Sequence, residues 1–366
     1  MASSRKSPCG IHRDPGRSKP GHGLRSVSRR AGVKPLPRWI NVAGLEFSTE
    51  GPDFSNATPG RSGEDWFVNG RKTYESLAAA GFRTFRVPFS WERLQPELRG
   101  PLAPEGVQAL RYQLNLARSV NAQVILDLHN EGRYAQAIEG GVERLALGEE
   151  RHGQVPLGPK ELADFWARMA HAFKAQPAVA GYGLMNEPHD LPAGAWVQAS
   201  QAAAEAIRDE GDQTMLYVAG DRWSSVAHWA RVNPSSPWVD DPLDKVTYEG
   251  HCYLDQNGSG KYALSYEEEL SFDPDLPQRA ESKLTPFLEW LEKNGAVGFL
   301  GEFAVPVQDP AWCGLLRPML ECLDGAGIQS AWWAAGEYWG DYPLSLQPPS
   351  RGKRAPLPAE VELFLD

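Results

Sequence analysis

The sequence predicts an α/β protein, a single (β/α)8 TIM barrel preceded by a basic tail. Eight short runs rich in apolar residues recur along the chain, and segments with helical patterning separate most of them. Most of the runs are nearly continuously apolar rather than alternating, which is typical of strands buried on both faces of a parallel sheet. The 366 residues are long for an ordinary domain but suit one barrel with loop insertions.

The predicted elements alternate along the body of the chain. The predicted strands cover residues 40–47, 84–89, 123–129, 179–186, 214–220, 245–253, 297–303 and 329–335. The predicted helices cover residues 69–80, 104–119, 159–175, 193–210, 279–294 and 310–324. Glycine directly follows several of these helices, as at Gly295 and Gly325, which indicates their C-terminal ends. A doubly wound open sheet is the alternative fold, but no GxGxxG turn follows the first strand.

Charge is distributed unevenly along the chain. Residues 1–36 hold nine Lys or Arg and one acidic residue, which is a net charge of +8. Because the whole chain has a net charge of −10, the other 330 residues carry a net charge of −18. The first segment is rich in Gly, Pro, Ser and Arg without an apolar pattern, which predicts a disordered tail over 1–36 and one folded catalytic unit over 37–366. The acidic body argues against nucleic acid as the partner.

Several other classes of protein are excluded by composition. No run approaches the roughly 18 uninterrupted apolar residues that a membrane span needs. The four cysteines are too few for a disulfide scaffold, and none lies in a CxxC pair that would indicate a zinc site. We also expect a monomer without a metal ion or cofactor.

The predicted strands end on polar and aromatic residues. In a (β/α)8 barrel the active site lies at the C-terminal ends of the strands. The residues that we expect at this rim are Arg86, His129, Asn130, Asn186, Glu187, His251, Tyr253, Glu302 and Trp333. A single strand-end glutamate is ordinarily a solvated charge, but gathering so many polar groups on one rim is costly unless they have a use.

Glu187 and Glu302 end the fourth and seventh predicted strands, so both can point inward from opposite sides of the barrel. Two facing carboxyl groups suit the hydrolysis of a glycosidic bond, because one protonates the leaving oxygen while the other attacks or stabilises the reacting carbon. A metal site is the weaker interpretation, since His129, His189 and His251 lie on different strands without an HExxH motif. A serine nucleophile is weaker still, because no GxSxG motif is present.

Seven ordered segments within residues 39–345 resemble glycoside hydrolase family 5, and in particular its branch of endoglucanase II-like cellulases. The segments are NVAGLEF at 41–47, FRVPF at 85–89, LDLHN at 126–130, LMNEPH at 184–189, HCYLD at 251–255 with SG at 259–260, FLGEF at 299–303 and WAAG at 333–336. The resemblance implies a retaining endo-β-1,4-glucanase that acts on a β-linked polysaccharide or oligosaccharide.

The resemblance also implies roles for the two glutamates. Glu187, in Asn-Glu-Pro, would be the acid/base, and Glu302, in Gly-Glu-Phe, would be the nucleophile. Their carboxyl groups should then lie about 5–5.5 Å apart, as in retaining enzymes. Arg86 and Tyr253 would keep Glu302 ionised and oriented, one by its charge and one by a phenolic hydrogen bond.

The remaining rim residues would contact the sugar. Asn186 would bind the 2-hydroxyl, and His251 would lie beside the acid/base. His129 and Asn130 would contact other hydroxyls, and Trp333 would form an apolar platform under the ring.

Two alternative functions remain open at this point. The first is a retaining hydrolase of the same fold that acts on another β-glycan, such as mannan, xyloglucan or a bacterial exopolysaccharide. The second is an inactive sugar-binding barrel, although the presence of both glutamates and their supporting polar residues counts against it. The resemblance implies an extracellular enzyme, whereas residues 1–36 contain no recognisable signal peptide.

Overall fold

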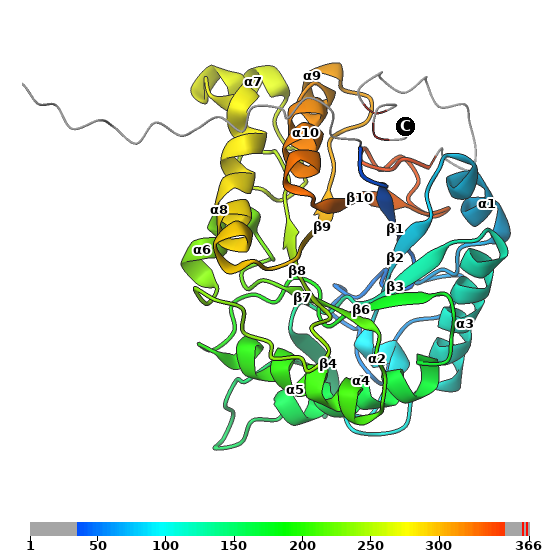
Figure 1. Ribbon diagram of the computed structural model, residues 1–366. Coiled ribbons are helices and arrows are strands. Elements are labelled where there is room, and N and C mark those ends of the chain that lie inside the picture. The colour runs from blue at the N-terminus through cyan, green and yellow to red at the C-terminus, as the bar shows by residue number, and fades with distance from the viewer. Residues whose placement is uncertain (1–34, 348–360, 362–363, 365–366) are drawn as a thin grey trace, which may run out of the picture.

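The computed structural model describes residues 35–347, 361 and 364, and its centre is a closed barrel of eight parallel strands (Figure 1). Around the barrel the strands follow the order β1-β10-β9-β8-β7-β6-β3-β2. Their bounds are β1 Trp39–Val42, β2 Thr84–Phe89, β3 Gln123–Leu128, β6 Val179–Gly183, β7 Met215–Ala219, β8 Val246–His251, β9 Gly298–Phe303 and β10 Gln329–Ala335. The predicted (β/α)8 fold is therefore confirmed.

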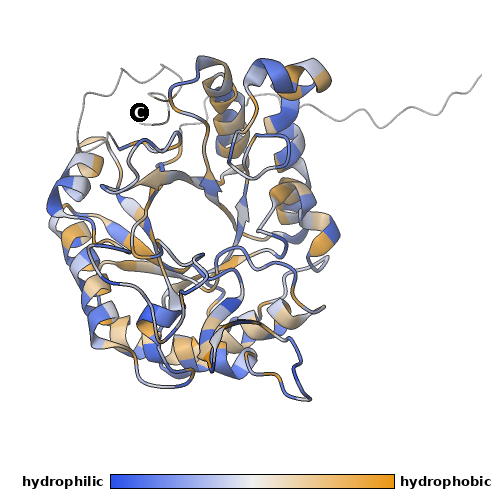
Figure 2. Ribbon diagram, turned by 180° about the vertical axis from the view of Figure 1, so that it is seen from behind, coloured by the Kyte–Doolittle hydropathy of each residue, from blue (hydrophilic) through white to orange (hydrophobic). Residues whose placement is uncertain are grey.

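Helices surround the barrel and connect most successive strands (Figure 1). The α-helices are α1 Arg71–Ala79, α2 Trp91–Leu94, α3 Pro104–Ser119, α4 Pro159–Phe173, α5 Ala195–Asp209, α6 Trp229–Val232, α7 Tyr266–Phe272, α8 Arg279–Asn294, α9 Pro310–Cys313 and α10 Leu316–Ala326. The part of the chain that the structure describes also contains two short 3-10 helices, η1 Val226–His228 and η2 Leu276–Gln278. Figure 2 shows the molecule from behind, and the helices contain both apolar and polar residues. This is expected for helices that pack one face against the barrel and expose the other.

The predicted and observed boundaries agree well for the regular elements. Predicted strands 84–89 and 329–335 coincide with β2 and β10, and predicted helices 104–119 and 279–294 coincide with α3 and α8. The first strand is shorter than predicted, because the regular pairing of β1 ends at Val42.

Two features of the structure correct the sequence prediction. The predicted helix 310–324 is divided into α9 and α10, and α10 continues past Gly325 to end at Ala326, where Gly327 caps it in the left-handed conformation (φ 74°). An antiparallel hairpin that was not predicted, β4 Arg133–Ile138 and β5 Gly141–Ala146, is inserted between β3 and α4. Its strands mix polar and apolar residues, so they lack the continuous apolar run that identified the barrel strands.

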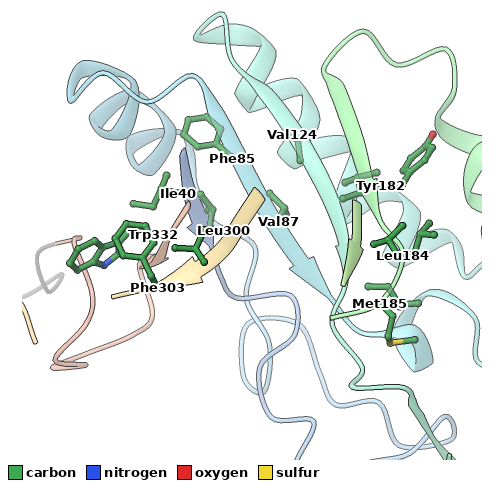
Figure 3. Close-up of a cluster of buried hydrophobic side chains, with 14 of the residues drawn as sticks. Ile40, Phe85, Val87, Val124, Tyr182, Leu184, Met185, Leu300, Phe303 and Trp332 are labelled. Carbon is green, nitrogen blue, oxygen red and sulfur yellow. The ribbon is translucent and has the colours of Figure 1, made fainter. Parts of the chain in front are cut away.

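Apolar side chains fill both the space between barrel and helices and the base of the barrel. Figure 3 shows part of the outer layer. The labelled side chains in that view are Ile40, Phe85, Val87, Val124, Tyr182, Leu184, Met185, Leu300, Phe303 and Trp332. A separate cluster of Ile125, Tyr217, Phe299 and Ala331 comes from four strands. Since successive side chains of a strand point to opposite faces, Ile125 between Val124 and Leu126 belongs to the interior layer.

The first residues that the structure describes contact helix α10. The backbone amide of Leu36 donates to Asp324 Oδ1 (3.2 Å), and Arg38 forms an ion pair with the same carboxylate. Residues 1–34 of the predicted tail lie outside the described residues, so the boundary at 36 stays a prediction. Within the described ranges, no helix is both long enough and apolar enough to cross a membrane.

Candidate active site

Because alternate residues of each strand point into the barrel, the side chains inside it form three layers. On β3, Ile125 belongs to the apolar layer at the base, Asp127 lies two residues further along on the same face, and His129 follows at the rim. On β8, Glu249 and His251 follow the same alternation. The sequence therefore places charged groups directly above an apolar floor, which lowers the local dielectric around them.

Glu187 and Glu302 face each other at the rim. Glu302 lies near the end of β9, and Glu187 lies just beyond β6. One oxygen of each carboxyl group and one nitrogen of His251 all lie within 4.8 Å of one another. This upper limit on the distance between the two carboxyl oxygens agrees with the close pair of a retaining enzyme, about 5–5.5 Å, and not with the about 6.5–9.5 Å of an inverting one.

Glu302 is bound through both of its carboxyl oxygens. Arg86 Nη1 donates to Oε1 (3.1 Å), and the Tyr253 hydroxyl donates to Oε2 (2.8 Å). Burial alone would raise the pKa of Glu302, but the positive charges of His251 and Arg86 outweigh burial and lower this pKa below its ordinary value. The Glu302 carboxylate is thus held as an anion.

Glu187 has the opposite electrostatic balance. Burial raises the pKa of the Glu187 carboxyl group, and the nearby negative charge of Glu302 raises it further. A hydrogen bond with His251 (2.7 Å) lowers this pKa, but the net effect is a raised pKa. Its backbone lies in the left-handed region (φ 44°), a conformation that persists only where the surroundings fix it. The two glutamates therefore favour different protonation states in one site.

Arg86 is the buried centre of the charged layer. Its Nη2 lies 2.9 Å from both Asp127 Oδ1 and Glu249 Oε1, and it donates to Asn186 Oδ1 at 2.6 Å. Its Nη1 donates to Asn41 Oδ1 (2.9 Å) as well as to the candidate nucleophile. This arrangement fixes the amide of Asn186. Its Nδ2 atom is left toward the rim, where it lies 3.3 Å from His129 Nε2.

The structure assigns a supporting place to Asp127 and Glu249, which the sequence analysis did not include among the site residues. Glycines on the neighbouring strands leave room for both side chains. A Cβ at Gly301 would lie 2.0 Å from Glu249 Oε1, and a Cβ at Gly183 would lie 2.6 Å from Asp127 Oδ1. Strand alternation could have identified both carboxylates, because each lies two residues before a predicted rim histidine.

The two rim histidines are held by carboxylates. His251 lies between Glu187 and Glu249, with its Nε2 3.1 Å from Glu249 Oε1, and the surrounding negative charges raise its pKa to about 10 against the effect of burial. His129 Nδ1 lies 2.9 Å from Asp127 Oδ2. Burial would lower the pKa of His129, but the hydrogen bond and charge of Asp127 raise it.

Trp333 lies beside His129, and the two rings stack with centroids 5.2 Å apart. The side chain is mostly buried, so it presents one limited face at the rim. Further aromatic rings continue from Trp333 through Trp339 to Phe47. Beyond Phe47, the ring of Phe67 lies 6.3 Å away and stacks in turn on the exposed Tyr338.

A second exposed aromatic ring lies near the acid/base candidate. Trp223 is 41% exposed and stacks on His189 at a centroid distance of 4.3 Å. Its backbone amide donates to the carbonyl oxygen of Pro188, directly after Glu187. Exposed flat rings of this kind suit contact with sugar faces.

Asn130 is not brought into the cluster that contains the two glutamates. Its Oδ1 accepts a hydrogen bond from the Trp91 amide (2.7 Å), and its Nδ2 donates to Glu92 Oε2 (2.8 Å) and to the Arg133 carbonyl oxygen (3.3 Å). These bonds tie α2 to the start of β4. The side chain thus holds the loop in this structure, and its contact with substrate stays a prediction.

The same cluster could be considered as a metal site, because Glu187, His251 and Glu302 each offer one ligand atom within 4.8 Å of the others. However, both ring nitrogens of His251 lie within hydrogen-bonding distance of carboxylates, Glu187 on one side and Glu249 on the other. The imidazole is therefore already engaged as a charged link between carboxylates, which is unfavourable for metal ligation by a neutral ring.

Comparison with known proteins gives consistent matches over the whole barrel. The family model for cellulase (glycosyl hydrolase family 5) matches residues 41–338. Endo-beta-1,4-glucanase A of Emericella nidulans is 32% identical over 319 residues, which cover 85% of this chain and 87% of that protein. The crystal structure of Pseudomonas stutzeri endoglucanase Cel5A in complex with cellobiose is 34% identical, covers 90% of this chain and 92% of its own, and superposes with a TM-score of 0.76. XacCel5A in complex with cellopentaose is 30% identical, with a TM-score of 0.74 over 90% of this chain and 98% of its own.

Proposed function

The chain belongs to glycosyl hydrolase family 5, and from this premise we propose that it is a retaining endo-β-1,4-glucanase with Glu187 as acid/base and Glu302 as nucleophile. The observation that carries the proposal is a pair of carboxyl groups with one oxygen of each within 4.8 Å of the other, where the pKa of Glu187 is raised and that of Glu302 is lowered. The named relatives are endo-β-1,4-glucanases, and the structures named above contain cellobiose and cellopentaose.

The proposed reaction is a double displacement. The Glu302 carboxylate attacks the anomeric carbon as Glu187 donates its proton to the departing glycosidic oxygen, which leaves a covalent glycosyl-enzyme. Glu187, now ionised, removes a proton from a water molecule that attacks the same carbon. The bond to Glu302 then breaks, and the product keeps the β configuration.

The surrounding residues support these steps. Arg86 and Tyr253 bind the two oxygens of Glu302, so they hold the attacking carboxylate in one orientation. Asn186, fixed by Arg86, is placed to bind the sugar's 2-hydroxyl, a contact that strengthens in the transition state. Trp333 provides the apolar face for the ring.

A panel of polysaccharides tests the proposed substrate. We expect the highest rates of reducing-sugar release on carboxymethylcellulose and mixed-linkage β-glucan, because the family relatives act on β-1,4-glucan and exposed aromatic rings lie near the glutamate pair. Higher rates on mannan or xyloglucan would contradict the proposed specificity, and no release from any of them would favour an inactive sugar-binding barrel. Glu302→Gln is the control for contaminating hydrolases.

The pH dependence of kcat/KM should be bell-shaped. Activity needs Glu302 ionised and Glu187 protonated, and the ordinary carboxyl pKa of 4.5 is lowered for Glu302 and raised for Glu187. Activity should therefore fall as Glu302 gains its proton in acid and as Glu187 loses its proton at higher pH.

His251 provides a test of this assignment, because its positive charge lowers the pKa of both glutamates. His251→Asn removes that charge, so both limbs of the profile should move to higher pH. His171→Asn, at an exposed histidine, is the matched control and should leave the profile unchanged. Movement of either limb to lower pH in His251→Asn would contradict the electrostatic account.

A further inference from the structure

The loop after β8 carries Tyr253, and a helix outside the barrel holds this loop by its backbone. Lys283 of α8 donates from Nζ to the carbonyl oxygens of Tyr253 (2.7 Å) and Asp255 (2.8 Å). Arg279, four residues earlier, donates from Nη1 to the carbonyl oxygen of Leu254 (2.8 Å). Residues four apart lie on the same face of a helix, so two cations of α8 bind three successive carbonyl groups.

The ring of Tyr253 is confined from another direction. Gly260, with a left-handed backbone (φ 71°), approaches so closely that a Cβ there would lie 2.8 Å from Tyr253 Cδ1. The Gly260 amide donates to Asp255 Oδ1 (3.0 Å), which closes the loop around the ring. With its backbone held by α8 and one side of its ring against Gly260, Tyr253 has little freedom to move away from Glu302.

Lys283 contacts carbonyl oxygens rather than a carboxylate in these two bonds. Its side chain is half-buried, and burial lowers the pKa of its ammonium group, so part of its hydration has been replaced by these carbonyls. Arg279, in contrast, is also paired with the buried Glu269, which accepts a hydrogen bond from the Gln256 amide (2.9 Å). Lys283 is thus the more direct link between α8 and Tyr253.

We propose that Lys283 is a positioning residue for the nucleophile: by binding the carbonyl oxygens on either side of Leu254, it holds the Tyr253 hydroxyl against Glu302. This inference rests on the proposed function, because it requires Glu302 to act as the attacking carboxylate. Lys283 itself lies behind the loop and acts only through Tyr253. Its removal should therefore reproduce, in weaker form, the kinetic signature of losing the tyrosine hydroxyl.

The test measures kcat/KM against pH with an aryl cellobioside for wild type, Lys283→Met, Tyr253→Phe and the double variant. Loss of the Tyr253 hydrogen bond to an ionised group should reduce kcat/KM about tenfold or more and move the acid limb to higher pH. Lys283→Met should move the acid limb in the same direction, with a loss of about three- to tenfold. In the Tyr253→Phe background, Lys283→Met should add less than about a twofold loss, because the hydroxyl that it positions is already absent.

Two further variants separate positioning from general stability. Lys283→Arg keeps two donors and should retain both the rate and the acid limb of wild type, and Lys293→Met, at an exposed lysine of the same helix, should do likewise. If Lys283→Met fails to fold, Lys283→Gln replaces it, since glutamine keeps a donor for one carbonyl. The loss of kcat/KM and the shift of the acid limb should then have the same direction but be smaller. The positioning role of Lys283 alone would be overturned if the acid limb moved in Tyr253→Phe but not in the folded Lys283 variant. It would also be overturned if the two losses of kcat/KM multiplied in the double variant. An unshifted acid limb in Tyr253→Phe would overturn the proposed role of Glu302 as well.

Discussion

Glu302→Gln should reduce kcat on a soluble β-glucan by at least about 10⁴-fold, a loss on the order of 5 kcal/mol of transition-state stabilisation. The amide is nearly the same size as the carboxyl group but cannot attack the anomeric carbon. Arg86 keeps its ion pairs with Asp127 and Glu249, so the fold of the barrel should persist. Steady-state kinetics and circular dichroism on the same preparation measure both expectations.

The control for Glu302→Gln is Glu281→Gln, at an exposed glutamate on α8, which should keep wild-type activity. Residual activity of Glu302→Gln above about a hundredth of wild type, in a preparation free of contaminating hydrolases, would be too high for loss of a covalent nucleophile. That result would require another residue to attack the sugar.

Glu187→Ala should lose activity to a degree that depends on the leaving group. A polysaccharide needs a proton on its departing oxygen, so its hydrolysis should fall by about 10²–10⁴-fold. A dinitrophenyl cellobioside needs little protonation and should still form the glycosyl-enzyme. That intermediate should then accumulate, because no base activates water, and stopped-flow measurement should show a burst of dinitrophenolate followed by slow turnover.

Azide should restore turnover of Glu187→Ala, because it attacks the glycosyl-enzyme without needing a base. His251→Asn serves as the comparison, since it changes the charge beside Glu187 but leaves the carboxyl group in place and should not be rescued by azide. Equal losses of Glu187→Ala on good and poor leaving groups would remove Glu187 from the acid/base role.

The barrel could be predicted from sequence because its strands are buried on both faces and read as apolar runs between helices. The hairpin of β4 and β5 could not, since its strands lie in a loop insertion and mix polar with apolar residues. The end of α10 was also missed. Gly325 and Gly327 are both possible C-terminal caps of the predicted helix, and only the backbone conformation shows that the second one ends it.

The rim residues could be proposed from sequence because polar side chains at the ends of apolar strands are conspicuous. The layer beneath them was not assigned. Whether Glu249 and Asp127 reach Arg86 depends on the register of strands around the closed barrel and on the space left by Gly301 and Gly183. The role of Lys283 could not be predicted either. Its partners are backbone carbonyl oxygens of a loop about 30 residues away, and no sequence motif indicates such contacts.

The most direct test of the central claim is the anomeric configuration, by proton NMR, of the glycosyl azides that the two alanine variants release from dinitrophenyl β-cellobioside. In Glu187→Ala, azide attacks the α-linked intermediate on Glu302 and should give the β-azide. In Glu302→Ala no intermediate can form, so azide attacks the substrate directly and should give the α-azide. Opposite anomers from the two variants are the predicted result, and the same anomer from both would contradict the assignment of Glu187 as acid/base and Glu302 as nucleophile.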